Sequence, residues 1–411
     1  MTSVDDCYRA AIGAGTDPSG TPWAELEPAV LAGRRTSMKW TRFPGALPMF
    51  VAEMDFPVAP EIRHALIERI EASDTGYLDT PGPLAPAFAD FARDRWGWEV
   101  PHDFVHLATD VATGVVEALR ALRPSGGRIA VPTPVYPGFF EMLVEVPFEV
   151  VEVPLADLPG GPRLDLPALE ALFAGDPGID ALLISNPHNP HGIVHARAEL
   201  EELARIAAAH DVLVVSDEIH APLTHRGAEF VPFAPLAAAA GALAVTTTSA
   251  SKGWNLAGVK CAVIVAANAR ANELLRRLPP ETTTRASILG LHANVAAFRD
   301  ARAWLDRTVA QSEANLRLLE ALVAERLDGV RVARSEAGYL AWLDLRGAGL
   351  GDDPRGRILA EAGVALNDGR SFGRGGAGHA RINLACAPDT IVEAVDRIAR
   401  VQGEGTAARR R

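Results

Sequence analysis

The sequence predicts an α/β protein that has a mostly parallel sheet in a large domain and a second, smaller α+β domain. Short apolar runs typical of strands buried on both faces recur between residues 128 and 266, and helical patterns separate many of them. This alternation of strand and helix favours a parallel sheet. After about residue 287 a long helical segment is followed by strands and helices in looser order, which indicates the second domain.

Five apolar runs are predicted as strands of the large domain: Arg128–Val131, Ala181–Ser185, Val212–Ser216, Ala244–Thr248 and Val259–Ala266. A helix is predicted over residues 198–210, where Leu200 and Leu203 share one apolar face. Ligands of such sheets collect beyond the carboxyl ends of the strands. Polar residues that directly follow these runs are therefore candidates for a functional site.

The C-terminal part is predicted to contain a long helical segment, two strands, a helix, a strand and a closing helix: Ser287–Leu327, Val330–Arg334, Leu340–Leu345, Arg355–Ala362, Arg381–Leu384 and Thr390–Val401. The first 55 or so residues are rich in Pro, Gly and Trp, and we expect an arm that packs on this second domain. The predicted division is 1–55 for the arm and part of the small domain, 56–287 for the large domain, and 288–411 for an interdomain helix and the C-terminal small domain.

The chain has 411 residues, of which 48% are hydrophobic and 22% are charged, as expected for a globular protein with a filled core. Its formal net charge of -12 disfavours nucleic-acid binding and offers no basic patch for a membrane surface. The longest apolar runs are too short to span a bilayer. We therefore expect neither a nucleic-acid partner nor a membrane partner.

The cysteines are odd in number and far apart, at Cys7, Cys261 and Cys386, so neither a disulfide framework nor a zinc site is predicted. Histidines that are near one another in the sequence form no clear ligand set, and no metal is expected. The N-terminus is acidic and lacks the apolar segment of a signal peptide. These features favour a reduced, cytoplasmic compartment.

Lys252 lies among small and hydroxyl residues directly after the apolar run 243–248, where a strand should end. A solvated charge is unusual there, but small neighbours suit an amine that must form a Schiff base with a carbonyl cofactor. The alternative is a surface lysine at a strand-to-loop corner, and Lys252 alone does not decide between the two.

Other segments favour the functional interpretation of this lysine. Asp217 ends the apolar run that precedes it, and Arg381 follows late in the chain, beside an apolar strand. Residues with purely structural roles are not expected to occur in this order, with an acidic residue at a strand end, then a lysine, and an arginine late in the chain.

With these motifs, the chain resembles the fold-type I pyridoxal-5′-phosphate (PLP) enzymes of the class I/II aminotransferase superfamily. The superfamily motifs are Asn-Pro-His-Asn-Pro-x-Gly at 186–192, Asp217, Ser-x-Ser-Lys at 249–252, and Arg381. Within the superfamily the chain is most similar to the cystathionine β-lyase-like C-S lyases of the MalY/PatB group, through Val51–Phe56, Gly76-Tyr77, Asp217–His220, Tyr339–Asp344 and Arg381–Cys386. The resemblance covers about residues 36–400. It implies a fold-type I large domain with a mostly parallel, seven-stranded sheet flanked by helices, and PLP as the cofactor.

The resemblance also assigns roles around the ring of the cofactor. Lys252 is expected to bind the aldehyde, and Asp217 to lie against the ring nitrogen, which must stay protonated if the ring is to withdraw electrons. Asn189 is expected to donate to the phenolic oxygen, and Tyr136 to stack on the ring, a contact that contributes about 0.5–1.5 kcal/mol. The structural alternatives are a helix cap for Asp217, a turn residue for Asn189 and a core position for Tyr136. Asn186 is interpreted as structural.

The phosphate of the cofactor needs backbone N–H groups at the start of a helix, together with hydroxyl groups. The resemblance assigns the N–H groups to Ala112 and Thr113 and the hydroxyl groups to Ser249 and Ser251. Tyr77 resembles a tyrosine that reaches the phosphate from the neighbouring subunit, which implies a homodimer.

Three further residues are assigned by the resemblance. Lys260 stands where aminotransferase relatives often place an arginine on the phosphate. Because lysine lacks the bidentate fork of arginine, it could neutralise the phosphate but would orient it less. The alternative is that the side chain of Lys260 points elsewhere. Arg381 is expected to bind the α-carboxylate of a small amino-acid substrate, with a surface ion pair as the alternative. His220 stands where many aminotransferases have a tyrosine, and both a cofactor contact and a core position remain open.

The implied activity is that of a carbon–sulfur β-lyase, which would convert cystathionine or another S-substituted L-cysteine into a thiol, pyruvate and ammonia. An aminotransferase that uses the same residues is an alternative, as is a secondary-metabolic enzyme for a bulky cysteine S-conjugate. A regulator that binds effectors or other proteins is a further alternative, which the intact Lys252, Asp217 and Arg381 disfavour.

Overall fold

The computed structural model describes residues 2–158 and 160–409, with the side chains of the last helix described through residue 403. The chain divides into two compact units. Unit 1 comprises Met1–Pro57, Pro190–Gly192 and Asp306–Arg411, and unit 2 comprises Val58–Asn189 and Ile193–Leu305. The boundary after Leu305 lies later in the chain than the expected boundary at residue 287.

Unit 2 is built on a seven-stranded sheet with the strand order β2-β10-β9-β8-β7-β3-β4. Five of its strands pair in parallel: β3 (Gly127–Thr133), β4 (Phe148–Pro154), β7 (Ala181–Ser185), β8 (Leu213–Asp217) and β9 (Ala244–Thr248). β10 (Ala262–Ala266) is antiparallel both to β9 and to β2 (Val105–Ala108). The predicted mostly parallel, seven-stranded sheet is confirmed.

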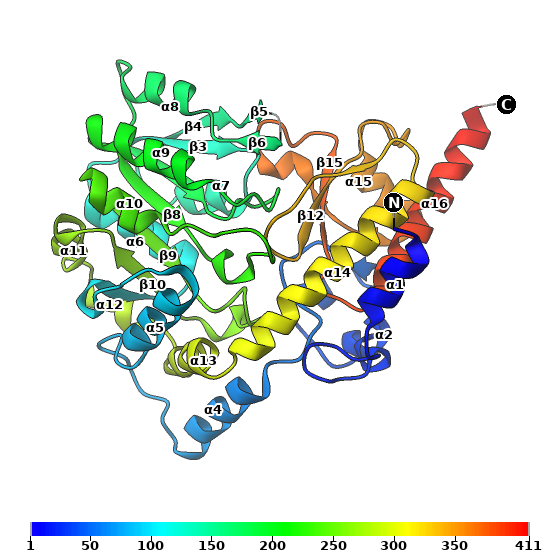
Figure 1. Cartoon of the computed structure of the whole chain (residues 1–411), viewed down its shortest axis with the longest axis horizontal. Coiled ribbons are helices and arrows are strands. Elements are labelled where there is room, and N and C mark those ends of the chain that lie inside the picture. Colours follow the sequence, from blue (N-terminus) through cyan, green and yellow to red (C-terminus); the bar gives the residue numbers. More distant parts are fainter. Residues whose placement is uncertain (1, 159, 410–411) are drawn as a thin grey trace. The chain divides into compact units, whose positions relative to one another are not determined.

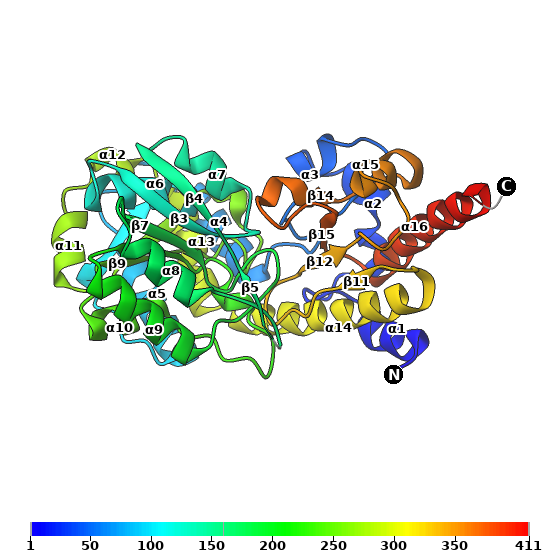
Figure 2. The same ribbon diagram turned by 90° about the horizontal axis from the view of Figure 1, so that it is seen from above.

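The two faces of this sheet carry separate apolar cores. Alternate residues of β3, β7 and β8 pack on one face with α6, α7 and α11, and the intervening residues pack on the other face with α8, α9 and α10. Figure 2 shows helices of the two sets on opposite sides of the strands. The bounds of these helices are Val111–Leu122 (α6), Gly138–Leu143 (α7), Leu166–Phe173 (α8), Arg197–Ala209 (α9), Phe233–Ala240 (α10) and Ala269–Leu275 (α11). Because helices cover both faces, the strands read as continuous apolar runs.

In the sequence, the other elements of unit 2 come before the first strand of the sheet, after its last strand, or between its strands. α13 packs against both α4 and α5, and the three helices lie together in Figure 1. This packing keeps the chain in unit 2 until residue 305. The bounds are Pro60–Glu71 (α4), Leu84–Trp96 (α5), His102–Phe104 (η2), Ala156–Leu158 (β5), Gly161–Arg163 (β6), Ala221–Leu223 (η3), Ala257–Val259 (η4), Pro280–Thr284 (α12) and Ile288–Arg299 (α13).

The helical segment expected over residues 287–327 is two helices rather than one. α13 ends at Arg299, and α14 (Arg302–Arg326) begins after Asp300 and Ala301. The indole N–H of the buried Trp254 donates to the carbonyl oxygen of Ala301 at 2.9 Å, so a side chain 47 residues away satisfies a backbone group at the break. No local pattern in the sequence indicates this contact.

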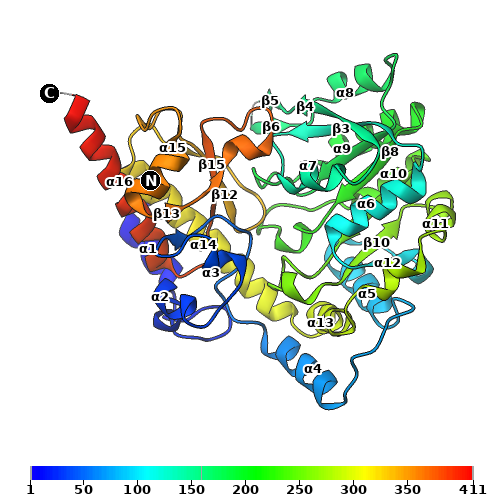
Figure 3. The same ribbon diagram turned by 180° about the vertical axis from the view of Figure 1, so that it is seen from behind.

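Unit 1 contains a four-stranded antiparallel sheet in the order β11-β12-β15-β14 and a parallel pair formed by β1 and β13. β12 and β15 lie side by side in Figure 3. The strand bounds are Leu47–Pro48 (β1), Arg331–Val332 (β11), Leu340–Asp344 (β12), Val364–Ala365 (β13), Asn367–Asp368 (β14) and His379–Asn383 (β15). The helix bounds are Val4–Ile12 (α1), Trp23–Leu26 (η1), Pro28–Ala32 (α2), Met38–Thr41 (α3), Pro354–Arg357 (α15), Ile358–Ala362 (η5), Gly369–Phe372 (η6) and Pro388–Arg409 (α16).

The N-terminal residues form part of unit 1 through strand pairing and one buried ion pair. Leu47 is paired with Val364, and the backbone N–H of Asn383 donates to the carbonyl oxygen of Met49 at 2.9 Å. The ammonium of Lys39 lies 2.5 Å from a carboxylate oxygen of Asp55, and both side chains are buried. These contacts fix residues 39–55 on the small sheet and its helices.

Candidate active site

The predicted site residues of unit 2 follow neighbouring parallel strands at one edge of the sheet. Ser185, Asp217 and Thr247 are register partners across β7, β8 and β9, so these three strand ends lie at the same level. Asn189 follows β7, and Lys252 follows β9. The topology therefore gathers a carboxylate, an amide and an amine at the carboxyl edge, where α/β sheets bind ligands.

Asp217 is buried at the end of β8 and has an altered acidity. Burial raises the pKa of its carboxyl to about 7, and this rise is opposed by a hydrogen bond from the backbone N–H of Ile219 and by the positive charge of Lys252. The Ile219 N–H lies 3.1 Å from the carboxylate. Lys252 is thus close enough to act on the charge of Asp217, and a second cation against this carboxylate would favour its ionised form further.

The loop that carries Lys252 is held by Asn294 from α13. Asn294 accepts a hydrogen bond from the backbone N–H of Ala250 at 2.8 Å and donates to the carbonyl oxygen of Gly290. Ser249 donates its hydroxyl to the carbonyl oxygen of Cys261 at 2.7 Å and accepts from the backbone N–H of Ser251. The Ser249 hydroxyl therefore closes this loop, whereas Ser251 is half-buried at its edge.

Asn189 is held at the end of the loop that follows β7. The hydroxyl of Ser185 accepts a hydrogen bond from the backbone N–H of Asn189 at 3.2 Å and donates to the carbonyl oxygen of Pro187. The carbonyl oxygen of Asn189 accepts from the backbone N–H of Tyr136 at 3.0 Å. This last bond ties the loop of Tyr136, which follows β3, to the loop of Asn189.

The ring of Tyr136 lies over a glycine. A Cβ atom at Gly138 would lie 2.3 Å from Cε1 of Tyr136, whose ring also contacts Phe139 in an edge-to-face arrangement with centroids 6.1 Å apart. Tyr136 is 38% exposed in the structure. Gly138 therefore sets the orientation of the tyrosine ring by leaving room for it.

The resemblance implies that Tyr136 stacks on the cofactor ring. On this expectation, Gly138→Ala would displace the Tyr136 ring and weaken cofactor binding by about three- to tenfold, because about 0.5–1.5 kcal/mol of stacking would be lost. The measurement is the dissociation constant of PLP by fluorescence titration, with Tyr136→Ala as the comparison. The double variant should be no worse than Tyr136→Ala alone. An additive loss would show that Gly138 acts independently of the ring.

The start of α6 carries Ala112 and Thr113 and is capped by Asp110. One carboxylate oxygen of Asp110 accepts from the backbone N–H of Thr113 at 2.9 Å, and the other lies 2.6 Å from the ammonium of Lys260. Burial favours the neutral form of Asp110, but Lys260 and the Thr113 N–H together lower the pKa of this carboxyl. Lys260 is thus brought to the helix start, with a carboxylate as its partner.

α6 begins close to the end of β9. A Cβ atom at Gly114 would lie 3.6 Å from Cγ2 of Thr247 and 3.5 Å from Cβ of Ala108. The helix N-terminus therefore lies over the same strand ends as Asp217, where its backbone N–H groups can bind an anion.

The remaining predicted residues occupy different environments. His220 is buried three residues after Asp217, at the start of η3. Tyr77 lies in the loop after α4 and is 91% exposed. Arg381 belongs to unit 1, where it is buried in β15; its guanidinium lies 5.2 Å from the ring centroid of Phe372 and donates to the carbonyl oxygen of Phe50 at 3.3 Å.

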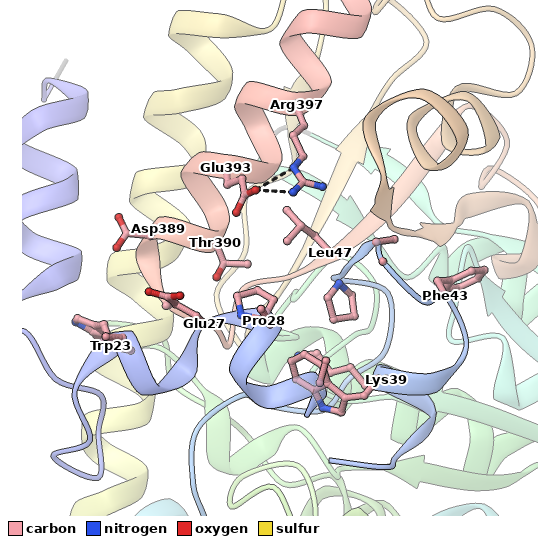
Figure 4. A pocket seen from close by; sticks show the side chains of 18 residues that line it. Trp23, Glu27, Pro28, Lys39, Phe43, Leu47, Asp389, Thr390, Glu393 and Arg397 are labelled. Carbon is pink, nitrogen blue, oxygen red and sulfur yellow. Dashed lines mark hydrogen bonds and ion pairs between the residues drawn. The ribbon is translucent and has the colours of Figure 1, made fainter. Parts of the chain in front are cut away.

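A cavity of about 550 Å³ in unit 1 contains none of these residues. Trp23, Lys39 and Phe43 line it, and across it Figure 4 shows the ion pair between Glu393 and Arg397, whose closest atoms are 2.5 Å apart. Among the His, Cys, Asp and Glu side chains that the structure describes, there is no group of three or more that could hold a metal ion. Nor do residues 2–158 and 160–409 contain a helix long and apolar enough to cross a membrane.

The donor set of unit 2 fits PLP. An amine lies beside a buried carboxylate whose negative charge a cation would stabilise, and a helix N-terminus at the same edge can bind a phosphate. Comparison with known proteins tests this fit independently. The model of the family described as aminotransferase class I and II matches residues 48–398.

The chain belongs to this family. It is 35% identical over 372 residues to the cystathionine beta-lyase of Corynebacterium glutamicum, covering 90% of this chain and 98% of that protein. It is 31% identical over 374 residues to the cystathionine beta-lyase PatB of Bacillus subtilis, covering 88% and 95%. The predicted resemblance to the MalY/PatB group is confirmed.

A solved structure shows the same fold with the cofactor. Cystalysin from Treponema denticola, which contains a pyridoxal 5′-phosphate cofactor, superposes with a TM-score of 0.84 at 26% identity and covers 90% of this chain and 96% of that chain. The predicted fold type I is confirmed, and the family membership supports PLP as the cofactor of this chain.

Three residues that organise the site were not predicted. Asp110 has a partial signal, since an aspartate three residues before Thr113 is a typical helix cap. Gly138 and Asn294 have none, because their importance comes from a ring and a loop that the fold brings to them.

Proposed function

We propose that the protein is a PLP-dependent carbon–sulfur β-lyase that acts on cystathionine or another S-substituted L-cysteine and releases a thiol, pyruvate and ammonia. The observation that carries the proposal is the pair formed by Lys252 and Asp217 at the carboxyl edge of the sheet, in which the charge of the lysine acts on the buried carboxyl. The names of the relatives from C. glutamicum and B. subtilis support the lyase reaction.

The proposal assigns roles around the cofactor ring to four residues of the chain. When bound, PLP supplies an electron-withdrawing ring that stabilises negative charge at the substrate Cα. Lys252 would hold the cofactor through its amine, and the same amine would accept the Cα proton of the substrate. Asp217 would keep a proton on the ring nitrogen, and Asn189 would donate to the phenolic oxygen. Tyr136 would stack on the ring.

The phosphate and the substrate carboxylate are assigned to other groups. Ala112 and Thr113 lie at the start of α6. Because the Thr113 N–H already donates to Asp110, we propose that the phosphate is bound by the Ala112 N–H, the Thr113 hydroxyl and Ser251. Ser249 is proposed to support the loop through Cys261, because its hydroxyl is already donated there. We propose that Lys260 neutralises part of the phosphate charge, and that Asp110 holds the Lys260 ammonium in place.

Arg381 is proposed to bind the α-carboxylate of the substrate with its paired N–H groups. The ring of Phe372 beneath the guanidinium and the carbonyl oxygen of Phe50 hold this side chain in one orientation. His220 is proposed to lie beside the cofactor, since it is buried close to Asp217 in the sequence.

An aminotransferase is the second candidate, because the matching family is named for that reaction. The two activities differ in whether an acceptor is required. With cystathionine alone, we expect continuous release of pyruvate in coupled lactate dehydrogenase assays. A reaction that stops after one turnover, and resumes only when a keto acid is added, would show transamination and would overturn the lyase proposal.

We further propose a homodimer in which Tyr77 reaches the phosphate of the neighbouring subunit. Tyr77 is 91% exposed in the single chain, and Ile67 and Ile70 of the preceding helix α4 are 47% and 55% exposed. Apolar side chains clustered in this way favour burial against a second subunit.

Tyr77→Phe is expected to weaken PLP binding by about fivefold to twentyfold, because one charge-assisted hydrogen bond is lost, while the dimer remains. The measurements are PLP affinity and the molar mass by analytical ultracentrifugation. A monomeric wild-type protein that binds PLP with full activity would contradict the proposed dimer.

A reducing, cytoplasmic location is also proposed. Its support is that Cys7, Cys261 and Cys386 are all free thiols buried in the structure. Burial raises the pKa of the Cys261 thiol to about 12, so this thiol is unreactive in the folded protein.

A further inference from the structure

Glu218, which directly follows Asp217, is fully enclosed in unit 2 and has an unusual set of contacts. Its Oε1 atom accepts three hydrogen bonds, from the backbone N–H of Phe233 at 2.9 Å, from the hydroxyl of Ser216 at 3.0 Å and from Nδ2 of Asn186 at 3.2 Å. Its Oε2 atom is buried and makes no hydrogen bond to any residue that the structure describes. A carboxylate with one oxygen saturated and the other bare in an apolar interior would be costly.

Within the described part of the chain, Asn186 has a buried acceptor atom without a donor, which complements the unpaired Oε2 atom of Glu218. Its Nδ2 donates to Glu218 and, at 3.1 Å, to the carbonyl oxygen of Val231, so the orientation of the amide is fixed by a backbone acceptor. Its Oδ1 is buried and has no donor among the described residues. A carboxylic acid at Glu218 would supply the missing donor, and the amide would supply the missing acceptor.

The backbone places the two side chains next to each other. Ser185 and Asp217 are register partners, Asn186 and Glu218 each follow them by one residue, and the backbone N–H of Asn186 donates to the carbonyl oxygen of Asp217 at 2.8 Å. A neutral acid facing an amide makes two parallel hydrogen bonds, of which one is present at 3.2 Å.

We propose that Glu218 is held as a neutral carboxylic acid whose Oε2–H donates to Oδ1 of Asn186, and that this acid–amide pair is a positioning element for Asp217 and Asn189. Asp217 precedes Glu218 directly, and Asn189 lies three residues after Asn186 in the same loop. The pair therefore links the segment that carries the Asp217 carboxylate to the loop that carries the Asn189 amide. The part that concerns Asn189 and the cofactor rests on the proposed function.

Electrostatics agrees with this protonation state. Burial raises the pKa of Glu218 to about 8, against the hydrogen bonds from Phe233, Ser216 and Asn186, and the nearby Asp217 raises it further. Among the described residues, the groups that the structure places against the carboxyl are these three donors and the Asp217 carboxyl, none of which is a cation.

The Glu218→Gln variant tests whether Glu218 is neutral or ionised in the folded protein. Glutamine keeps the acceptor at Oε1 and places an N–H donor where the acid has its proton, so the pair with Asn186 is retained. Because the folded pKa is raised above the unfolded value of about 4.3, wild type holds one proton more when folded than when unfolded between these pH values. Its stability relative to the Glu218→Gln variant is complete below about pH 4.3 and is lost as the pH rises toward 8.

The expected result is that the unfolding equilibrium constant of wild type rises by up to about tenfold per pH unit relative to Glu218→Gln, measured by urea denaturation at pH values from 5 to 8. A difference between wild type and Glu218→Gln that does not change between pH 5 and pH 8 would overturn the proposal, because it would show that Glu218 is ionised in the folded protein as in the unfolded one. A Glu218→Gln variant that becomes less stable relative to wild type as the pH rises would overturn it as well.

Glu199→Gln is the matched control. Glu199 is also largely buried in unit 2, but it lies 3.3 Å from Nδ1 of His195 and accepts from the backbone N–H of Leu164 at 2.8 Å. Burial alone would raise the pKa of Glu199, but His195, the Leu164 N–H and Arg163 together more than offset this and lower it. The control variant is therefore expected to be less stable than wild type at pH 7, opposite in sign to Glu218→Gln.

The positioning role has its own readout, which is the pH at which the visible absorption of the bound cofactor changes. Glu218→Asp shortens the side chain and breaks the pair, and we expect it to move this pH by half a unit or more; Glu218→Gln and Glu199→Gln should leave it in place. An unmoved pH in Glu218→Asp would overturn the positioning role. Lack of cofactor absorption in wild type would instead reject the proposed function, and the denaturation experiment would still test the acid–amide pair.

Discussion

Lys252→Ala is expected to lower kcat/KM for cystathionine by about two to four orders of magnitude, because the general base catalysis proposed for the lysine amine would be lost. The loss should fall mainly on kcat, since the groups proposed to bind the phosphate and the substrate carboxylate remain. Steady-state assays of pyruvate release measure both parameters.

Lys260→Ala is the natural comparison for this variant. Lys260 lies on the surface, with its side chain 52% exposed and its ammonium paired with Asp110. Removing it should weaken the affinity for PLP a few-fold and leave kcat close to wild type at saturating cofactor. If the two alanine variants lost kcat equally, Lys252 would not have the proposed role.

Asp217→Asn is expected to lower kcat/KM by about two to three orders of magnitude, because the proposed buried partner of the ring nitrogen would lose its charge. The same variant should make the cofactor-free protein more stable at alkaline pH. Burial raises the pKa of the carboxyl to about 7, so ionisation opposes folding above that pH. Asparagine cannot ionise, and we expect a gain of about 1–3 kcal/mol in the free energy of unfolding at pH 8.

The sign of this stability effect follows from the raised pKa. Wild type holds its extra proton in the folded state between the unfolded pKa of about 3.9 and the folded value of about 7, so its stability relative to Asp217→Asn falls across this window. Thermal or urea denaturation of both proteins without cofactor at pH 5 and pH 8 measures it. A variant that is less stable than wild type at pH 8 would show that the carboxylate stabilises the free protein.

The strands were predictable because helices cover both faces of the sheet. Ala181–Ser185 and Ala244–Thr248 have the predicted bounds. The first is an apolar run that ends in a serine, and the second consists of one alanine and four β-branched residues. β10 is shorter than predicted. It begins at Ala262 instead of Val259, because residues 257–259 form a 3-10 turn and Lys260 has a φ of 50°. A left-handed residue interrupts a strand, and hydrophobicity alone does not reveal it.

The placement of Asn189, Asp217 and Lys252 at or after strand ends was predictable from the sequence, whereas the contacts that support these residues were not. Ser249 was assigned to the phosphate by its place in a motif, but its hydroxyl donates to Cys261. The loop of Lys252 depends on Asn294, which is 44 residues away from Ala250. Such partners are fixed by packing between helix and sheet, so they leave no pattern in the local sequence.

The central claim is that the amine of Lys252 binds the cofactor covalently. The chain offers a clear test, because it contains only three lysines, Lys39, Lys252 and Lys260. The protein would be incubated with PLP, reduced with borohydride, digested, and mapped by mass spectrometry. We predict one pyridoxyl group per chain, on the peptide that contains Lys252; no adduct, or an adduct confined to Lys39 or Lys260, would contradict the claim.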